Sequence, residues 1–127
     1  MRIQFDEKYF MAKAIDEAKI ALSKGEVPVG AVIVADNKII ARAHNMVEAL
    51  NDVTAHAEIL AITSASNYIG GKYLENCSIY VTLEPCQMCA GALYWSRISK
   101  IYYGAEDPKR GFLALGNLMH PKTKIYK

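Results

Sequence analysis

Residues 29–35 form an almost wholly apolar run, VGAVIVA, and this run constrains the fold more than any other stretch of the chain. A strand that is apolar at every position is typical of a strand buried on both faces of its sheet. Asp36 and Asn37 follow with the chemistry of a tight turn, and residues 38–43 are expected to form a second strand, so we predict a hairpin. Other elements must then cover both faces of the sheet.

The remaining pattern alternates between helices and strands. Asp6 is expected to be the N-cap of a helix over residues 6–24, where apolar residues recur at spacings of three and four. Thr54 is expected to cap a helix that runs to residue 66, after a polar loop over residues 44–53. The later expected elements are strands at 77–83, 98–103 and 122–127 and helices at 85–96 and 112–117. This order predicts the α/β class, a mixed sheet covered by helices.

The composition favours one folded domain, residues 1–127, and excludes several classes of protein. Of 127 residues, 52% are apolar and 22% are charged, which is close to the average of globular domains and argues against wholesale disorder. No apolar run approaches the roughly 20 residues that cross a bilayer, and the N-terminal region shows no export signal. We therefore expect a cytoplasmic protein that does not associate with membranes.

The strongest chemical signal is the motif HAE at residues 56–58 together with PCQMC at residues 85–89. One imidazole nitrogen, from His56, and two thiolates, from Cys86 and Cys89, are good zinc ligands, and three protein ligands leave a fourth position open, as in catalytic zinc sites. The two cysteines are three residues apart, so they share one face of a helix's first turn. We expect two helix N-termini to point at the metal and to favour ionised thiolates.

Glu58 is expected to move protons rather than to bind the metal. Zinc acidifies its bound water to a pKa of about 7, and a neighbouring carboxylate can take that proton and pass it to a substrate. A stabilising zinc knuckle, with Glu58 on the surface, is one alternative. A redox Cys-x-x-Cys pair is another, but it leaves the His-x-Glu motif unexplained. Cys77 is expected to be an ordinary core residue.

These motifs resemble those of the zinc-dependent nucleobase deaminases, and among them the TadA-type tRNA adenosine deaminases. The matching segments are GEVPVGAV at residues 25–32, Asn45, TAHAEI at 54–59, TLEPCQMCAGA at 82–92 and DPKRG at 107–111. The resemblance implies a three-layer α/β/α sandwich around a five-stranded mixed sheet, a catalytic zinc on His56, Cys86 and Cys89, and a homodimer. It also implies hydrolytic deamination of adenosine to inosine at the wobble position of a tRNA anticodon loop, with a zinc-bound hydroxide attacking C6 and Glu58 as proton shuttle.

The resemblance extends to residues around the zinc motifs. Four residues are expected to bind the substrate: Val29, Asn45, Ala57 and Glu84. Four more are expected to contact nucleic acid: His44, Asp107, Lys109 and Arg110. Asn45 would read the base edge or hold the ribose, Glu84 and Ala57 would act through their backbone, and Val29 would form a pocket wall. Each role has an alternative. Asn45 would be an ordinary turn residue, Glu84 would only pair with nearby groups, and Val29 would only pack in the core. Asp107, Lys109 and Arg110 would belong to a solvated charged loop.

The zinc motifs do not separate an RNA-acting deaminase from one that acts on DNA or on a free base, nucleoside or nucleotide such as guanine or cytosine. The motif TLEPCQMCAGA at residues 82–92 and the basic C-terminal third of the chain favour an RNA substrate. Tyr94 and Trp95, which we expect at a dimer interface, weakly favour a free base. A non-catalytic partner subunit is disfavoured because Glu58 is present. Family members usually continue into a C-terminal helix that touches RNA, whereas this sequence ends at Lys127. We expect this difference to affect the affinity for RNA more than the zinc chemistry.

Overall fold

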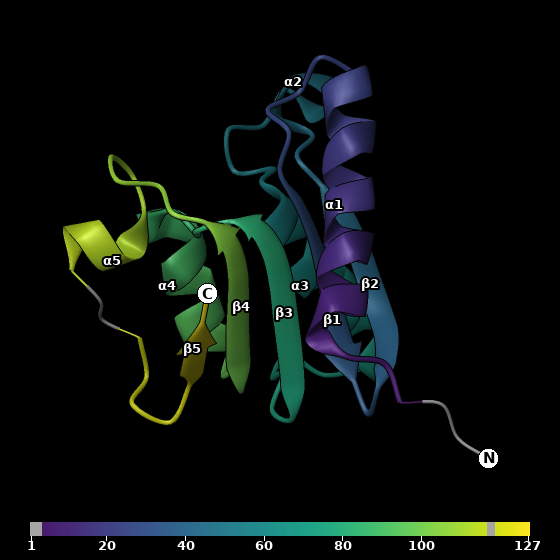
Figure 1. Ribbon diagram of the computed structural model, residues 1–127, viewed down its shortest axis with the longest axis vertical. Coiled ribbons are helices and arrows are strands. Elements are labelled where there is room, and N and C mark those ends of the chain that lie inside the picture. Colours follow the sequence, from purple (N-terminus) through teal and green to yellow (C-terminus); the bar gives the residue numbers. More distant parts are fainter. Residues whose placement is uncertain (1–3, 117–118) are drawn as a thin grey trace.

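The computed structural model describes residues 4–116 and 119–127, and in it helices cover both faces of a five-stranded sheet (Figure 1). The elements are α1 (Glu7–Ser23), β1 (Gly30–Ala35), β2 (Lys38–His44), α2 (Val47–Leu50), α3 (Ala57–Ile69), β3 (Cys77–Leu83), α4 (Gln87–Ser96), β4 (Lys100–Ala105), α5 (Phe112–Leu115) and β5 (Lys124–Tyr126). The strand order is β2-β1-β3-β4-β5. β1 is antiparallel to β2 and β3, whereas β3, β4 and β5 are parallel, so the predicted mixed sheet of the α/β class is confirmed.

The strand β1 is buried on both faces, as its apolar sequence predicted. Ala31 and Ile33 belong to the core beneath α3 and α4, and Val32 and Val34 belong to the core beneath α1. The turn to β2 places Asp36 and Asn37 at φ values of 51° and 61°, the left-handed pair that a two-residue hairpin turn requires. The predicted hairpin is therefore confirmed.

The helix α1 packs against β1 at very close range. Asp6 is its N-cap, as predicted, and its carboxylate accepts a hydrogen bond from the backbone N–H of Tyr9 at 3.0 Å. A Cβ atom at Gly30 would collide with the backbone of Ala14 and Ala18 in α1. The absence of a side chain at Gly30 is thus what lets this helix lie directly on the strand.

The opposite face of the sheet carries α3 and α4, which contact each other (Figure 1). The core between them and the sheet includes Ala61, Leu93 and Cys77, so the prediction of Cys77 as a core residue is confirmed. None of the helices in the described part of the chain has the length and apolar character needed to cross a membrane.

Several predicted boundaries were wrong by a few residues. The helix α3 begins at Ala57 with His56 as its N-cap, instead of being capped by Thr54, because the N–H and hydroxyl of Thr54 both bind Asp52 Oδ1, at 2.9 and 2.7 Å, in a local turn. The expected polar loop before it contains α2, and α4 begins at Gln87 rather than at residue 85. β4 starts at Lys100 rather than at residue 98, and residue 117 of the expected last helix lies outside the described residues.

Candidate metal centre and substrate cavity

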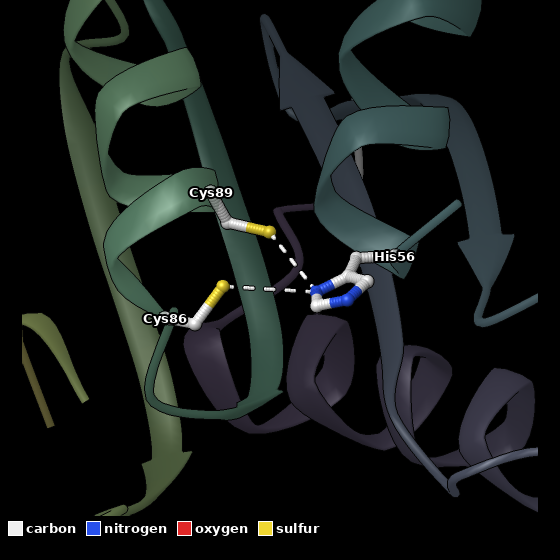
Figure 2. A group of neighbouring side chains, drawn as sticks. All are labelled: His56, Cys86 and Cys89. Carbon is white, nitrogen blue, oxygen red and sulfur yellow. Dashed lines mark hydrogen bonds between the residues drawn. The ribbon is translucent and has the colours of Figure 1, made fainter. Parts of the chain in front are cut away.

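The three predicted metal ligands lie together at the N-termini of two neighbouring helices (Figure 2). His56 is the N-cap residue of α3, Cys86 is the N-cap residue of α4, and Cys89 lies in the first turn of α4. The Sγ atoms of Cys86 and Cys89 are 3.7 and 3.5 Å from His56 Nδ1. The two helix dipoles therefore place partial positive charge at the same point, which favours anionic ligands.

The spacing of these atoms fits a tetrahedral zinc ion. Zinc binds nitrogen at about 2.0 Å and sulfur at about 2.3 Å, so a tetrahedral site holds its nitrogen and sulfur ligands roughly 3.5 Å apart. All three ligand atoms lie within 4.8 Å of one another, which is close enough for one ion to contact all of them. One imidazole and two thiols form a three-ligand set, which leaves a fourth position for water or substrate.

The two thiols are electrostatically unequal. The Cys89 thiol donates a hydrogen bond to Cys86, and this bond lowers the pKa of Cys86 to about 5. The same bond, together with burial, raises the pKa of Cys89 far above its usual range. Without a metal, this hydrogen bond favours a thiolate at Cys86 and a protonated thiol at Cys89. Binding of a cation at this point displaces the remaining proton from Cys89.

Glu58 lies in the first turn of α3, two residues after His56, and only 4% of it is exposed. Burial raises the pKa of its carboxyl to about 7, and a backbone hydrogen bond partly opposes this shift. A carboxyl with a pKa near neutral pH is suited to accept and return a proton in one reaction. The burial of Glu58 argues against the zinc-knuckle alternative, which required this residue on the surface.

A cavity of about 340 Å³ opens beside the metal ligands. Its wall contains eight of the predicted residues: Val29, Asn45, His56, Glu58, Glu84, Cys86, Asp107 and Arg110. Ala57, His44 and Lys109 are not among the described residues that line it. A larger cavity of about 580 Å³ lies at the other end of α4, beside Trp95 and Arg97, and holds none of the predicted catalytic groups.

Asn45 links the end of β2 to the start of α3. Its Oδ1 accepts a hydrogen bond of 2.8 Å from the backbone N–H of Ala57, and the contact is buried. This bond supplies the N-terminal capping that the N-cap residue His56 does not provide. The Ala57 N–H, which we expected to face the substrate, is therefore engaged within the chain.

Glu84 acts through its side chain rather than through the backbone alone. It is 4% exposed, and its two carboxylate oxygens accept hydrogen bonds from the backbone N–H groups of Asp107 and Leu113, at 3.1 and 2.9 Å. A Cβ at Gly111 would collide with this carboxylate, so the loop fits closely around it. Glu84 thus holds the segment between β4 and α5 against the end of β3.

The charged residues of that segment differ in position. Asp107 Oδ1 accepts hydrogen bonds from the backbone N–H groups of Lys109 and Arg110, at 3.2 and 3.1 Å, so Asp107 shapes the turn. Arg110 is exposed and lines the cavity, which is the arrangement expected of a contact to a phosphate group. Lys109 is exposed but lies away from the cavity wall.

His44 points to the opposite face of the sheet from Asn45. Its Nδ1 lies 3.0 Å from Glu17 Oε1 of α1, and only 13% of each of the two side chains is exposed. His44 is the last residue of β2 and pairs with Gly30, the residue of β1 on which α1 packs, so its side chain lies on the α1 side of the sheet. The structure therefore does not place His44 among the described residues that line the cavity, and a contact of His44 with nucleic acid stays a prediction.

No sequence pattern singled out Glu26, although it lines the cavity with Val47, Glu48 and Val53. Its carboxylate is 6% exposed and accepts hydrogen bonds from the backbone N–H groups of Glu48 and Ala49, at 3.1 and 2.9 Å. The sequence offered one indication of this role: Glu26 is an acidic residue between a glycine and an apolar strand, in the segment GEVPV.

Comparison with known proteins agrees with this geometry. Residues 5–105 match the family of the cytidine and deoxycytidylate deaminase zinc-binding region. A tRNA-specific adenosine deaminase of Aquifex aeolicus is 56% identical over 105 residues, which cover 83% of this chain and 70% of the relative. A tRNA-specific adenosine deaminase of Bacillus subtilis is 51% identical over 114 residues, covering 90% of this chain and 70% of the relative.

Two solved structures extend the comparison to the fold. One, from biochemical and structural studies of A-to-I editing by tRNA:A34 deaminases at the wobble position of transfer RNA, superimposes with a TM-score of 0.88 at 44% identity, covering 94% of this chain and 91% of its own. The guanine deaminase of Bacillus subtilis superimposes with a TM-score of 0.78 at 42% identity, covering 80% and 66%. The three-layer sandwich expected from the resemblance is thereby confirmed.

Proposed function

Since this chain belongs to the family of the cytidine and deoxycytidylate deaminase zinc-binding region, we propose that it is a zinc-dependent enzyme that deaminates adenosine to inosine in tRNA, at the wobble position of the anticodon loop. The observation that carries the proposal is the cluster of three zinc-type ligand atoms, from His56, Cys86 and Cys89, at a cavity whose wall contains His56, Cys86 and the buried Glu58. The similarity to tRNA-specific adenosine deaminases, at 51–56% identity, supports RNA as the substrate class.

The metal would be held by His56 Nδ1 and by the thiolates of Cys86 and Cys89. When bound, zinc supplies a Lewis acid that makes a water molecule acidic near neutral pH. The chain contributes two helix N-termini and a partly dry cavity around that point.

Glu58 moves the protons of the reaction. Deamination consumes one water and releases one ammonia: the water oxygen bonds to C6 of the adenine ring, and the C6–N bond then breaks. Glu58 accepts a proton from the attacking water and delivers it to the ring nitrogen N1, and a later transfer makes the amine a better leaving group. A carboxyl whose pKa lies at about 7 exchanges a proton in either direction at little cost near neutral pH.

The remaining cavity residues bind and orient the base. A volume of about 340 Å³ lies within the usual range of small-molecule sites, roughly 300–1,000 Å³, and suits one base extruded from a loop. Val29 offers an apolar wall, and the amide of Asn45 offers polar atoms at its edge. Arg110, exposed at the cavity, is placed to contact a phosphate of the flanking RNA.

A second copy of the chain is the partner we expect. Tyr94 and Trp95 lie in the last turn of α4 and are 38% and 76% exposed, and adjacent exposed aromatic side chains are enriched at protein–protein interfaces. We therefore propose a homodimer through this part of α4, to be checked by light scattering of the wild type and of Trp95→Ser.

A free-base deaminase is the second candidate, because the guanine deaminase of Bacillus subtilis shares the fold at 42% identity. The deciding experiment incubates zinc-loaded protein with an anticodon stem-loop RNA that carries a wobble adenosine. Free adenosine, guanine and cytosine are tested in parallel, with Glu58→Ala as the blank. We expect inosine in the RNA and none with Glu58→Ala. Turnover of guanine alone would establish the second candidate instead.

A further inference from the structure

Two loops that line the cavity are each held by one buried glutamate. The first loop comprises α2 and the residues after it, and it contributes Val47, Glu48 and Val53 to the wall. The second loop joins β4 to α5 and contributes Asp107 and Arg110. We refer to them as the α2 loop (residues 46–53) and the β4–α5 loop (residues 106–111).

Glu26 holds the α2 loop. It lies between α1 and β1, yet its carboxylate reaches the first turn of α2 and accepts hydrogen bonds from the N–H groups of Glu48 and Ala49, at 3.1 and 2.9 Å. The N-cap residue of α2, Met46, makes no side-chain capping bond. A four-residue helix has too little internal hydrogen bonding to persist by itself, so its position depends on this carboxylate.

Glu84 holds the β4–α5 loop in the same manner. Its two oxygens bind the N–H groups of Asp107 and Leu113, which flank the turn that carries Arg110. Both glutamates are more than nine-tenths buried, and each uses both carboxylate oxygens on backbone N–H groups of a neighbouring loop. Hydrogen bonds from an amide to a carboxylate are among the stronger ones in proteins, and burial strengthens them further.

We propose that Glu26 and Glu84 are a pair of positioning residues that hold the α2 loop and the β4–α5 loop at the separation that admits one nucleotide of the substrate. Neither carboxylate takes part in the proton transfers of Glu58. The identity of the substrate in this proposal rests on the proposed function, whereas the holding of the loops does not. The consequence is that the cavity is already formed before RNA binds, so binding does not have to order either loop.

The test uses Glu26→Gln, which keeps the shape of the side chain but replaces one acceptor by an N–H₂ group that faces the N–H of the loop. Hydrogen–deuterium exchange of the zinc-loaded protein should show about tenfold faster exchange at the amides of residues 48 and 49. Glu84→Gln should give the same increase at residues 107 and 113. Glu75→Gln is the matched control. Glu75 is an exposed glutamate just before β3, and its replacement should change the exchange rates of neither loop.

The functional arm measures the affinity for the anticodon stem-loop RNA in a Glu58→Gln background, in which turnover is expected to be too slow to deplete the RNA during the measurement. Glu26→Gln should raise the Kd about tenfold, and on active enzyme it should raise KM with kcat within about twofold. Unchanged exchange, an unchanged Kd, or a loss of kcat at constant KM would each overturn the proposal. If the wild type neither binds nor deaminates this RNA, the proposed function fails, and the exchange rates alone still decide whether the glutamates position the loops.

Discussion

At the scale of single residues, the site depends on burial and hydrogen bonding, which change the pKa values of its ionisable groups. Burial raises the pKa of Glu58 to about 7, and a shared hydrogen bond makes Cys86 the acidic member of the cysteine pair. These two shifts have different consequences. The raised pKa of Glu58 makes its carboxyl able to exchange protons near neutral pH. The lowered pKa of Cys86 favours the thiolate form, which can bind a metal ion.

Replacing Glu58 by Gln should abolish proton transfer without removing the metal ligands. We expect kcat to fall by about 10²–10⁴-fold, since that is the usual contribution of general acid–base catalysis. Zinc content, measured by elemental analysis, should stay at the wild-type level. A variant that loses zinc together with activity would instead identify Glu58 as a ligand.

The raised pKa of Glu58 also makes the stability of the metal-free protein depend on pH. The carboxyl has an ordinary pKa of 4.5 and a pKa of about 7 in the folded chain, so the folded state binds more protons between these values. The contribution of Glu58 is therefore fully present below pH 4.5 and is lost as the pH rises to about 7, by up to about 3 kcal/mol.

Urea unfolding of metal-free wild type and Glu58→Gln, under reducing conditions, checks this linkage. The difference in the free energy of unfolding between the two proteins should change steadily between pH 4.5 and 7 and be constant outside that window. A difference that does not vary with pH would show that Glu58 keeps an ordinary pKa in the folded chain.

At the scale of elements, close contact between α1 and β1 determines where the sheet's first strand can lie. The contact exists because Gly30 has no Cβ, which allows the backbone of Ala14 and Ala18 to approach the strand. The strand leads directly from Val29 in the cavity wall, so the packing of α1 also fixes one side of the site.

Gly30→Ala should therefore destabilise the protein by about 1–3 kcal/mol, because α1 has to move away from the strand. Denaturant unfolding with circular dichroism measures the change. Gly71→Ala is the matched control, since a Cβ there meets nothing within 4 Å and its φ is not positive, and its effect should stay within about 0.5 kcal/mol. Equal effects at both glycines would refute the close-contact explanation.

At the scale of the whole molecule, the metal ligands join segments that are far apart in the sequence. His56 follows the hairpin and starts α3, whereas Cys86 and Cys89 follow β3 and start α4. Because β2 and β3 are each antiparallel to β1, they run in the same direction, and the two helices that follow them begin at the same end of the sheet. A bound ion would thus cross-link the two helices on one face.

Removing the metal with a chelator should lower the melting temperature, and adding zinc back should restore it. A ligand at a thousandfold excess over its Kd stabilises the folded state by about 4 kcal/mol. Cys86→Ser should melt at one temperature with or without chelator. Cys77→Ala, a buried cysteine outside the ligand set, should keep its sensitivity to the chelator. A wild type that does not respond would mean that the ion is not part of the folded structure.

Much of this protein could be predicted from local patterns in the chain. The fully apolar strand, the Asp36-Asn37 turn and the N-cap Asp6 depend on neighbouring residues alone, and each is confirmed. The ligand types could also be predicted, because the spacing of cysteines in one helical turn is a local property. Helix starts were less accurate, since Thr54 binds Asp52 in a turn instead of capping α3.

The roles that depend on distant contacts were decided only by the tertiary structure. His44 was expected to contact nucleic acid, and only the folded structure shows that its imidazole lies 3.0 Å from the carboxylate of Glu17 in α1. The roles of Glu26 and Glu84 in holding two loops could be recognised only in the folded structure. There, each carboxylate lies within hydrogen-bond distance of backbone N–H groups that are about 20 to 30 residues away in the sequence. The sequence by itself determined the chemistry that the chain can offer. The packing of helices on the sheet decided which side chains are buried, which are hydrogen-bonded and which line one cavity. Burial and hydrogen bonding depend on neighbours in space rather than along the chain.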